Sequence, residues 1–314
     1  MSLTTDKIND HVKSIMRSRR NKDKAVVLCE GDIDSVRNVG LNPSMYRQLE
    51  KMPDANFYRA GLPKLARTTK TPVFYPCGSR ADVIKVFFKL RELHADVQED
   101  SYIDINKLFA IVDLDIQKSR IENYKFSDTE QIFQDLYDHL NINHNKIDDH
   151  IIFVTGLIHK EAYFLLPELQ RLFNDYKNPV SYKNNKLDLY NLYHEILTDS
   201  QNDQDLNRNF EVVRSRLSFL TPNLSNVSDL QLSLNSKYQN NFAPEIAKIL
   251  FLFRKAKPYW ENIHTEESLM TADKLREQLS LEIARFFSEE NNNDFHLTAI
   301  FKSIYKQAYG ISIE

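Results

Sequence analysis

The sequence predicts an α/β protein, with a mostly parallel sheet flanked by helices and a mainly α-helical C-terminal region. In the first half, short apolar runs alternate with amphipathic helical patterns, as in parallel sheets covered on both faces. Glycine usage supports the second part of the prediction. Only six glycines occur in 314 residues, five of them before residue 157, against an average usage of about 7%. Because glycine serves sharp turns, we expect the second half to be mostly helix.

Four strands are expected, at residues 25–29, 72–76, 108–112 and 151–154. Each run is unbroken by charge, and runs of this length and composition are typical of strands with both faces buried. Each ends at a polar residue or shortly before a glycine. The residues that follow them are Glu30-Gly31, Cys77-Gly78, Asp113 and Thr155-Gly156.

Helical patterns separate these strands. Ser79 with Asp82 three residues later is typical of a helix start, and an apolar stripe from Val83 to Leu93 follows. A capping box beginning at Ser127 predicts a second helix with its apolar side inward. In the second half, helices are expected at 161–176, 187–198, 206–220, 244–257, 271–288 and 295–309. We therefore expect two domains, an α/β domain at 1–175 and a mainly helical domain at 176–314 for substrate or partner binding.

Composition excludes several classes of protein. Lys plus Arg is 41 and Asp plus Glu is 44, so the net charge of −3 excludes a polycationic nucleic-acid coat. Cys29 and Cys77 are the two cysteines, which excludes a disulfide scaffold or a zinc ribbon and favours the cytoplasm; both are expected to be buried packing residues. The most apolar stretch, 246–253, is short and contains Lys248, so no membrane association is expected.

Acidic residues follow two of the predicted strands. Glu30 follows the first, and Asp113 and Asp115 follow the third. Alternation along an extended chain would point both aspartates to one side, and the carboxyl ends of parallel strands are where ligands bind. A single aspartate there is more often a turn or cap residue, but converging carboxylates need a hard cation. Oxygen ligands favour Mg²⁺ or Mn²⁺, and phosphodiester hydrolysis is typical of such sites.

These residues resemble the Toprim domain of topoisomerases, bacterial primases and OLD-type nucleases, in which a Glu and a D-x-D hold Mg²⁺. The resemblance extends to Toprim nuclease subunits of PARIS-type anti-phage systems, which act beside ABC-type ATPases. It covers about residues 24–170, roughly half of the chain. The matching segments are Glu30-Gly31-Asp32-Ile33-Asp34, Gly78-Ser79-Arg80-Ala81-Asp82-Val83-Ile84, Val112-Asp113-Leu114-Asp115, and Thr155 followed by Glu161-Ala162-Tyr163-Phe164-Leu165.

The resemblance implies a site around one cation. Glu30, Asp113 and Asp115 would be catalytic metal ligands, and Asp34 and Glu161 could complete the site. The last segment departs from the usual I-E-N-Y-L, so Glu122 in Ile121-Glu122-Asn123-Tyr124 competes with Glu161. Lys160 could stabilise charge on the scissile phosphate. The alternatives are first-turn helix acids for Asp34 and Glu161, and an ordinary exposed lysine for Lys160.

Basic residues offer a nucleic-acid surface. Arg59, Lys64 and Arg67 are expected in a loop before the second strand, where they could contact a phosphate backbone. Arg80 at a helix start suits a phosphate. The alternative is a solvated charged face.

The resemblance implies an Mg²⁺- or Mn²⁺-dependent endonuclease that cuts RNA, tRNA included, or DNA as the effector of a bacterial anti-phage system. An ABC-type ATPase would regulate it in trans, since this chain has no G-x-x-x-x-G-K-[ST] motif of its own. A homodimer is one open assembly. The alternative function is a catalytically inactive Toprim scaffold that docks on an ATPase.

Overall fold

The computed structural model describes residues 3–33, 53–68, 70–96, 101–220, 224–238, 244–265, 270–290 and 295–313. Asp34, expected to complete the metal site, lies outside the described residues.

A four-stranded parallel sheet forms the centre of the α/β part. Its strands are β1 (Val26–Cys29), β2 (Val73–Pro76), β3 (Leu108–Val112) and β6 (Ile152–Val154), in the order β2-β1-β3-β6. Every residue of the four strands is buried, as expected for uncharged apolar runs covered on both faces. All four predicted strands, and the α/β class, are confirmed. Because β1 and β3 are neighbours, the chain segments that follow them begin side by side.

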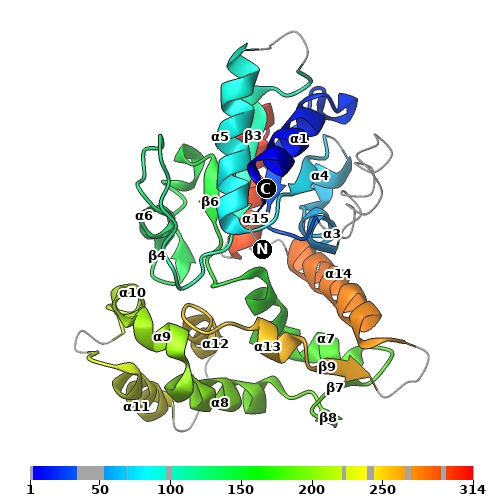
Figure 1. Cartoon of the computed structure of the whole chain (residues 1–314). Helices are drawn as coiled ribbons and strands as arrows, with labels where there is room; N and C mark the ends of the chain where they lie inside the picture. Colours follow the sequence, from blue (N-terminus) through cyan, green and yellow to red (C-terminus); the bar gives the residue numbers. More distant parts are fainter. Residues whose placement is uncertain are drawn as a thin grey trace.

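Helices cover both faces of this sheet (Figure 1). On one face, α5 (Arg80–Asp96) contacts β1 and β3, and α1 (Thr5–Met16) packs on α5. On the other face lie α3 (Pro53–Ala60) and the C-terminal α15 (His296–Tyr309). The ring of Phe301 in α15 lies 6.0 Å from that of Phe74 in β2 and 6.5 Å from that of Tyr58 in α3. The end of the chain therefore contributes to the core of the first half.

The chain leaves the sheet after β6 through two 3-10 helices, η6 (Lys160–Leu165) and η7 (Pro167–Leu169), and the short α7 (Gln170–Asp175). A small antiparallel sheet of order β8-β7-β9 follows. Its strands are β7 (Val180–Tyr182), β8 (Asn185–Lys186) and β9 (Ile263–Thr265). The helices of this part are α8 (Leu189–Asp199), α9 (Gln204–Arg208), α10 (Phe210–Arg216), α11 (Val227–Tyr238), α12 (Pro244–Leu250), α13 (Lys257–Trp260) and α14 (Ala272–Glu290).

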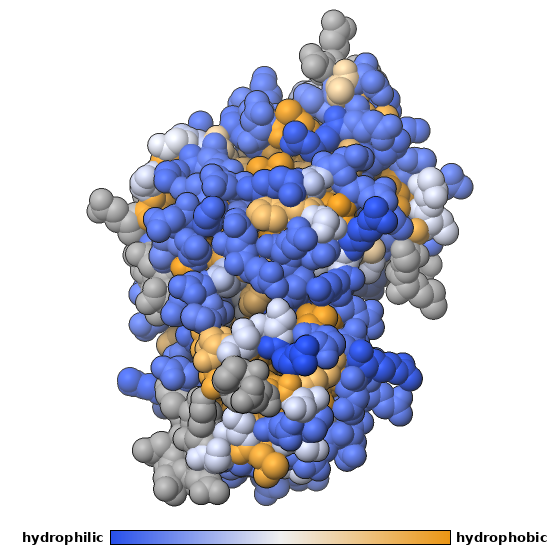
Figure 2. Space-filling model, turned by 90° about the vertical axis from the view of Figure 1, so that its left-hand side faces the viewer, coloured by the Kyte–Doolittle hydropathy of each residue, from blue (hydrophilic) through white to orange (hydrophobic). Residues whose placement is uncertain are grey.

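The remaining elements are short, apart from α6. They are η1 (Arg19–Asn21), α4 (Lys64–Thr68), η4 (Ile105–Lys107), α6 (Thr129–Leu136), β4 (Tyr137–Asp138), β5 (Asn141–Ile142), η5 (Ile147–Asp149) and η8 (Ser200–Asn202). The side of the molecule in Figure 2 is mostly hydrophilic, and apolar side chains are more frequent in its lower part. Among the described residues, no helix combines the length and apolar character that crossing a bilayer requires.

Several local expectations were wrong. The helix expected at 161–176 is interrupted, because Pro167 cannot continue it and starts a new turn. The segment of Arg59, Lys64 and Arg67, expected to be a loop, is mostly helical: Arg59 lies in α3, and Lys64 and Arg67 lie in α4. At the start of α6 the cap is Asp128, whose carboxylate accepts the N–H of Gln131, and not Ser127. The capping box predicted at Ser79 is confirmed in part: the carboxylate of Asp82 accepts hydrogen bonds from both the N–H and the hydroxyl of Ser79.

Candidate functional site

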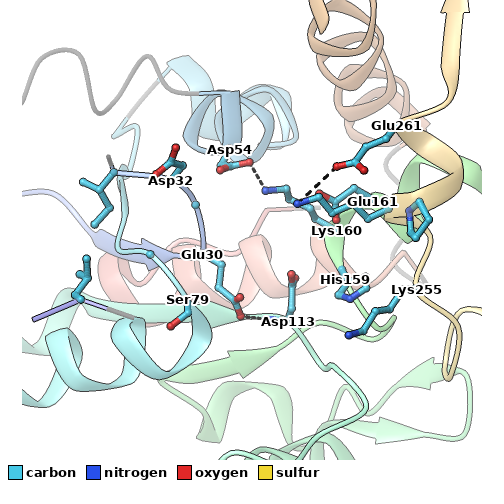
Figure 3. Close-up of a pocket in the computed structure, with 16 residues that line it drawn as sticks. Glu30, Asp32, Asp54, Ser79, Asp113, His159, Lys160, Glu161, Lys255 and Glu261 are labelled. Carbon is cyan, nitrogen blue, oxygen red and sulfur yellow. Dashed lines mark hydrogen bonds and ion pairs between the residues drawn. The ribbon is translucent and has the colours of Figure 1, made fainter. Parts of the chain in front are cut away.

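A cleft of about 680 Å³ lies where β1 and β3 end (Figure 3). The ends of the strands, η6 and the segment around α13 contribute its walls. Its lining is mostly polar and charged. The charged side chains among its lining residues are Glu30, Asp32, Asp54, Asp113, Lys160, Glu161, Lys255, Lys257 and Glu261, with His159 beside them.

Glu30 is held in the cleft by backbone geometry. The loops after β1 and β2 are joined by two hydrogen bonds between Gly31 and Gly78, of 3.0 and 2.9 Å. An added Cβ at Gly31 would lie 2.5 Å from a carboxylate oxygen of Asp54, so only glycine fits this close approach. The E-G pair of the sequence therefore places a carboxylate at the cleft and allows α3 to lie against it.

Glu30 and Asp113 meet, as expected. Oε1 of Glu30 accepts a hydrogen bond of 2.8 Å from the backbone N–H of Asp113. Burial raises the pKa of Glu30 to about 7, although the hydrogen bond from Asp113 and the charges of Arg80 and Lys160 oppose that shift. Burial and the charge of Glu30 also raise the pKa of Asp113 well above its usual range. Two carboxylates in this environment resist ionising together unless a cation is added.

Asp113 has an oxygen without a protein partner. Among the described residues, its Oδ1 is buried and accepts no hydrogen bond. A buried carboxylate oxygen is normally satisfied, and an orphaned one indicates an absent ligand or a strained site. Asp113 therefore fits a cation ligand.

Asp115 does not point into the cleft with Asp113, which corrects the expectation from alternation. The strand ends at Val112, and Asp115 adopts a left-handed backbone with φ of 45°, so the alternation of an extended chain no longer holds. The carboxylate of Asp115 accepts the N–H of Ile116 at 2.6 Å and lies 3.9 Å from the guanidinium of Arg80. Asp115 is near Glu30 electrostatically but is not among the residues lining the cleft.

Lys160 and Glu161 enter the cleft from η6 (Figure 3). The Lys160 ammonium forms an ion pair with Asp54, and the two side chains are only 15% and 21% exposed. Burial alone would lower the pKa of Lys160, but the charges of Asp54, Glu161 and Asp113 outweigh it and raise that pKa. Lys160 is therefore a cation fixed beside the Glu30–Asp113 pair, not an ordinary exposed lysine.

The two competitors for the last acidic position lie in different places. Glu161 lines the cleft, and its charge raises the pKa of Asp113. Glu122 is exposed, in the loop before α6, and is not part of the cleft lining.

The four cations expected to bind phosphate do not line the cleft. Arg67 donates to the carbonyls of Leu62 and Ala60, and Lys64 is exposed on α4. Arg59 lies on α3 and is half-buried. Arg80 donates to the carbonyls of Leu114 and Gln117 at 2.9 and 2.6 Å. These bonds make Arg80 a support for the D-x-D loop.

A buried ion pair fixes the same loop from the helical side. Arg216 of α10 and Glu130 of α6 are 2.6 Å apart and almost completely buried. The guanidinium also donates to the carbonyl of Asp115 at 2.7 Å and to that of Leu252 at 3.0 Å. The loop that follows β3 is therefore connected both to α10 and, through Arg216, to the segment just after α12.

Sequence reasoning missed several residues of the cleft. Asp54, His159, Lys255, Lys257 and Glu261 all line it. Burial lowers the pKa of His159, and its Nδ1 is buried without a partner among the described residues. The one usable signal was Pro53-Asp54, which is typical of a helix start; the others are brought in by tertiary packing alone.

The residues present fit a divalent cation in part. The fit rests on the orphaned oxygen of Asp113 and on the adjacent Glu30, both hard oxygen donors. Among the described residues, however, no three His, Cys, Asp or Glu side chains already form a cluster able to hold a metal. A third ligand would require Asp115 or Glu161 to turn toward the pair.

Comparisons of the chain with models of protein families, with curated proteins and with solved structures found no match.

Proposed function

We propose that this chain is a metal-dependent phosphodiesterase of the Toprim type that cuts nucleic acid. The observation that carries the proposal is the meeting of Glu30 and Asp113 at the ends of adjacent parallel strands, with one oxygen of Asp113 orphaned and Lys160 fixed beside them. Carboxylates with a buried lysine are a donor set for Mg²⁺ or Mn²⁺ and a phosphate. The β2-β1-β3-β6 parallel sheet is compatible with a Toprim-like fold.

Each side chain has a role in this proposal. Glu30 and Asp113 would hold the cation, completed by Asp115 or Glu161, and the bound cation would supply Lewis-acid activation of the phosphate. Lys160 is positioned by Asp54. Its ammonium would lie beside the phosphate and stabilise the negative charge that develops there during the reaction. The role in anti-phage defence and an ABC-type ATPase partner belong to the same proposal and rest on the sequence resemblance.

The test is cleavage by the purified chain. Transfer RNA, single-stranded RNA and plasmid DNA are incubated with Mg²⁺, with Mn²⁺ or with EDTA, and products are resolved on gels. Cleavage that needs the cation and is lost in Glu30→Gln supports the proposal. If the chain, alone and in the presence of a co-expressed partner ATPase, cuts none of these substrates, the proposal fails.

A catalytically inactive scaffold is the second candidate. It is favoured by Asp115, whose carboxylate is engaged by Ile116 and Arg80 instead of the cleft. Calorimetric titration with Mn²⁺ separates the two candidates, because an inactive scaffold needs no cation affinity and a nuclease does.

A further inference from the structure

The cleft has a second wall that the proposed chemistry does not use. Lys255 and Lys257 line it together with Glu261, and all three come from the segment 255–261, which follows α12 and includes α13. Figure 3 shows Lys255 and Glu261 on the side of the cleft opposite Glu30. This wall lies far from Glu30 and Asp113 in the sequence. Tertiary packing therefore brings Lys255 and Lys257 to the same cleft as the carboxylate pair.

This wall is fixed in place by buried contacts on its N-terminal side. The carbonyl of Phe251 accepts the N–H of Ile158 at 2.8 Å, and the carbonyl of Leu252 accepts Arg216 at 3.0 Å. Ile158 in turn accepts the N–H of Asp115 at 2.9 Å. The lysines therefore follow directly from backbone that is hydrogen-bonded to the D-x-D loop.

Buried contacts also fix the wall after the lysines. The ring of Trp260 lies 4.8 Å from that of Phe164, which belongs to η6. The hydroxyl of Tyr259 donates to Asp199 at 2.8 Å and accepts from Arg254 at 3.0 Å. Lysines on a free surface lose side-chain and backbone entropy when they bind, whereas here the backbone part of that cost is already met by folding.

The ion pairs of these lysines are loose. Lys255 lies 3.4 Å from Asp205, and Lys257 lies 3.9 Å from Glu261, with the lysine side chains 38% and 61% exposed. An ammonium has three donors, and an exposed pair at such distances contributes little stability. Both ammonium groups therefore keep donors for an anion that enters the cleft.

We propose that Lys255 and Lys257 bind a backbone phosphate of a polynucleotide, one that flanks the phosphate at Glu30 and Asp113. This inference rests on the proposed function and names its substrate class: a nucleic-acid strand long enough to reach both walls. In the absence of a cation, the carboxylates of Glu30 and Asp113 repel a polyanion. Lys255 and Lys257, which we call the lysine wall, supply an attraction that does not depend on the metal.

The experiment measures binding without chemistry. Fluorescence anisotropy of a fluorescein-labelled single-stranded RNA oligonucleotide is followed in EDTA over a series of salt concentrations. In the double variant K255Q/K257Q we expect affinity to fall about tenfold or more. The slope of log Kd against log salt should decrease by about 0.7, the contribution of one phosphate contact on a single strand.

Two further variants make the result specific. Lys89 and Lys183 are 34% and 59% exposed and are also paired with carboxylates, but neither lines the cleft. K89Q/K183Q removes the same charge and should leave binding within about twofold of the wild type. K255R/K257R retains both charges and should bind the oligonucleotide with an affinity close to that of the wild type.

Either of two results would overturn the inference: an equal loss in K89Q/K183Q, or wild-type chain that binds the oligonucleotide no better than K255Q/K257Q. Because the assay contains no metal, its failure is separate from that of the phosphodiesterase proposal. If K255Q/K257Q binds the oligonucleotide as the wild type does and the chain still cleaves, the phosphodiesterase proposal stands and the role of Lys255 and Lys257 is refuted. If binding depends on Lys255 and Lys257 but no substrate is cleaved, the role of these lysines stands and the phosphodiesterase proposal fails.

Discussion

The carboxylate of Glu30 accepts the backbone N–H of Asp113 at 2.8 Å, which joins the ends of two neighbouring parallel strands. This bond engages one carboxylate oxygen of Glu30, Oε1, and the second oxygen takes no part in it. It also places the side chain of Asp113, with its orphaned Oδ1, next to a second carboxylate. The pair therefore consists of two adjacent carboxylates whose pKa values are both raised, mainly by burial, which is the arrangement that the proposed cation would stabilise.

Glu30→Gln should abolish metal-dependent cleavage and preserve the fold. The amide oxygen of glutamine can still accept the N–H of Asp113, whereas the charge that attracts a divalent cation is lost. We expect the cleavage rate to fall by at least about 100-fold, with Mn²⁺ affinity reduced in parallel. Rates from gels and calorimetric Mn²⁺ titration check this. A variant that cleaves at the wild-type rate would remove Glu30 from the site.

The raised pKa of Glu30 predicts how stability depends on pH in EDTA. Its ordinary pKa is 4.5 and its folded value is about 7, so the folded state keeps a proton that the unfolded state has lost. Unfolding free energy should therefore decrease as pH rises from about 4.5 through about 7, by on the order of 3 kcal/mol. Glu30→Gln should lose most of this dependence, the remainder coming from Asp113, whose pKa is also raised.

Chemical denaturation of both proteins between about pH 5 and about pH 8 measures this difference. At the upper end the Gln variant should be the more stable of the two. Added Mn²⁺ should stabilise the wild type at high pH and have little effect on the variant. Parallel pH profiles for the two proteins would show that Glu30 is already ionised in the folded state.

The sheet could be predicted from the sequence, and so could the positions of Glu30 and Asp113. Buried parallel strands carry an unmistakable local signal, because runs such as 108–112 contain only apolar residues. That the residues after β1 and β3 meet at one edge of the sheet then follows from the parallel topology. What could not be predicted was the path of the chain immediately beyond the strand: Asp115 turns away through a left-handed conformation, which a sequence pattern does not encode for aspartate.

The second half was predicted less well, for a different reason. The helices expected at 187–198, 271–288 and 295–309 are confirmed as α8, α14 and α15, but those expected at 206–220 and 244–257 are broken into shorter helices. The strands β7, β8 and β9 have two or three residues each, too few to show alternation. Lys255 and Lys257 reach the cleft through contacts between residues far apart in sequence, such as Phe164 with Trp260. No local pattern reports such a contact.

Lys160 and Asp54 should show strong coupling. Asp54→Asn leaves a largely buried ammonium without its main counter-charge, and we expect a loss of about 1–3 kcal/mol in unfolding free energy. Lys160→Met in addition removes the uncompensated charge, so the double variant should be more stable than the sum of the single effects predicts. A double-mutant cycle by urea denaturation measures this, and additive effects would show that the ion pair contributes nothing.

Arg216 should control the D-x-D loop from a distance. It makes a buried pair with Glu130 and donates to the carbonyl of Asp115 at 2.7 Å. Arg216→Met leaves Glu130 buried and unpaired, so a loss of about 3–5 kcal/mol in unfolding free energy is expected. Combining it with Glu130→Leu should recover much of this loss, because an apolar pair needs no charge compensation.

The double variant E130L/R216M then separates stability from positioning. Its fold should be retained, but the carbonyl of Asp115 has lost its donor, so the loop that carries Asp113 is held less firmly. We expect weaker Mn²⁺ binding and slower cleavage at saturating oligonucleotide. A purely structural role predicts wild-type Mn²⁺ affinity once stability is restored, and that result would contradict control of the loop by Arg216.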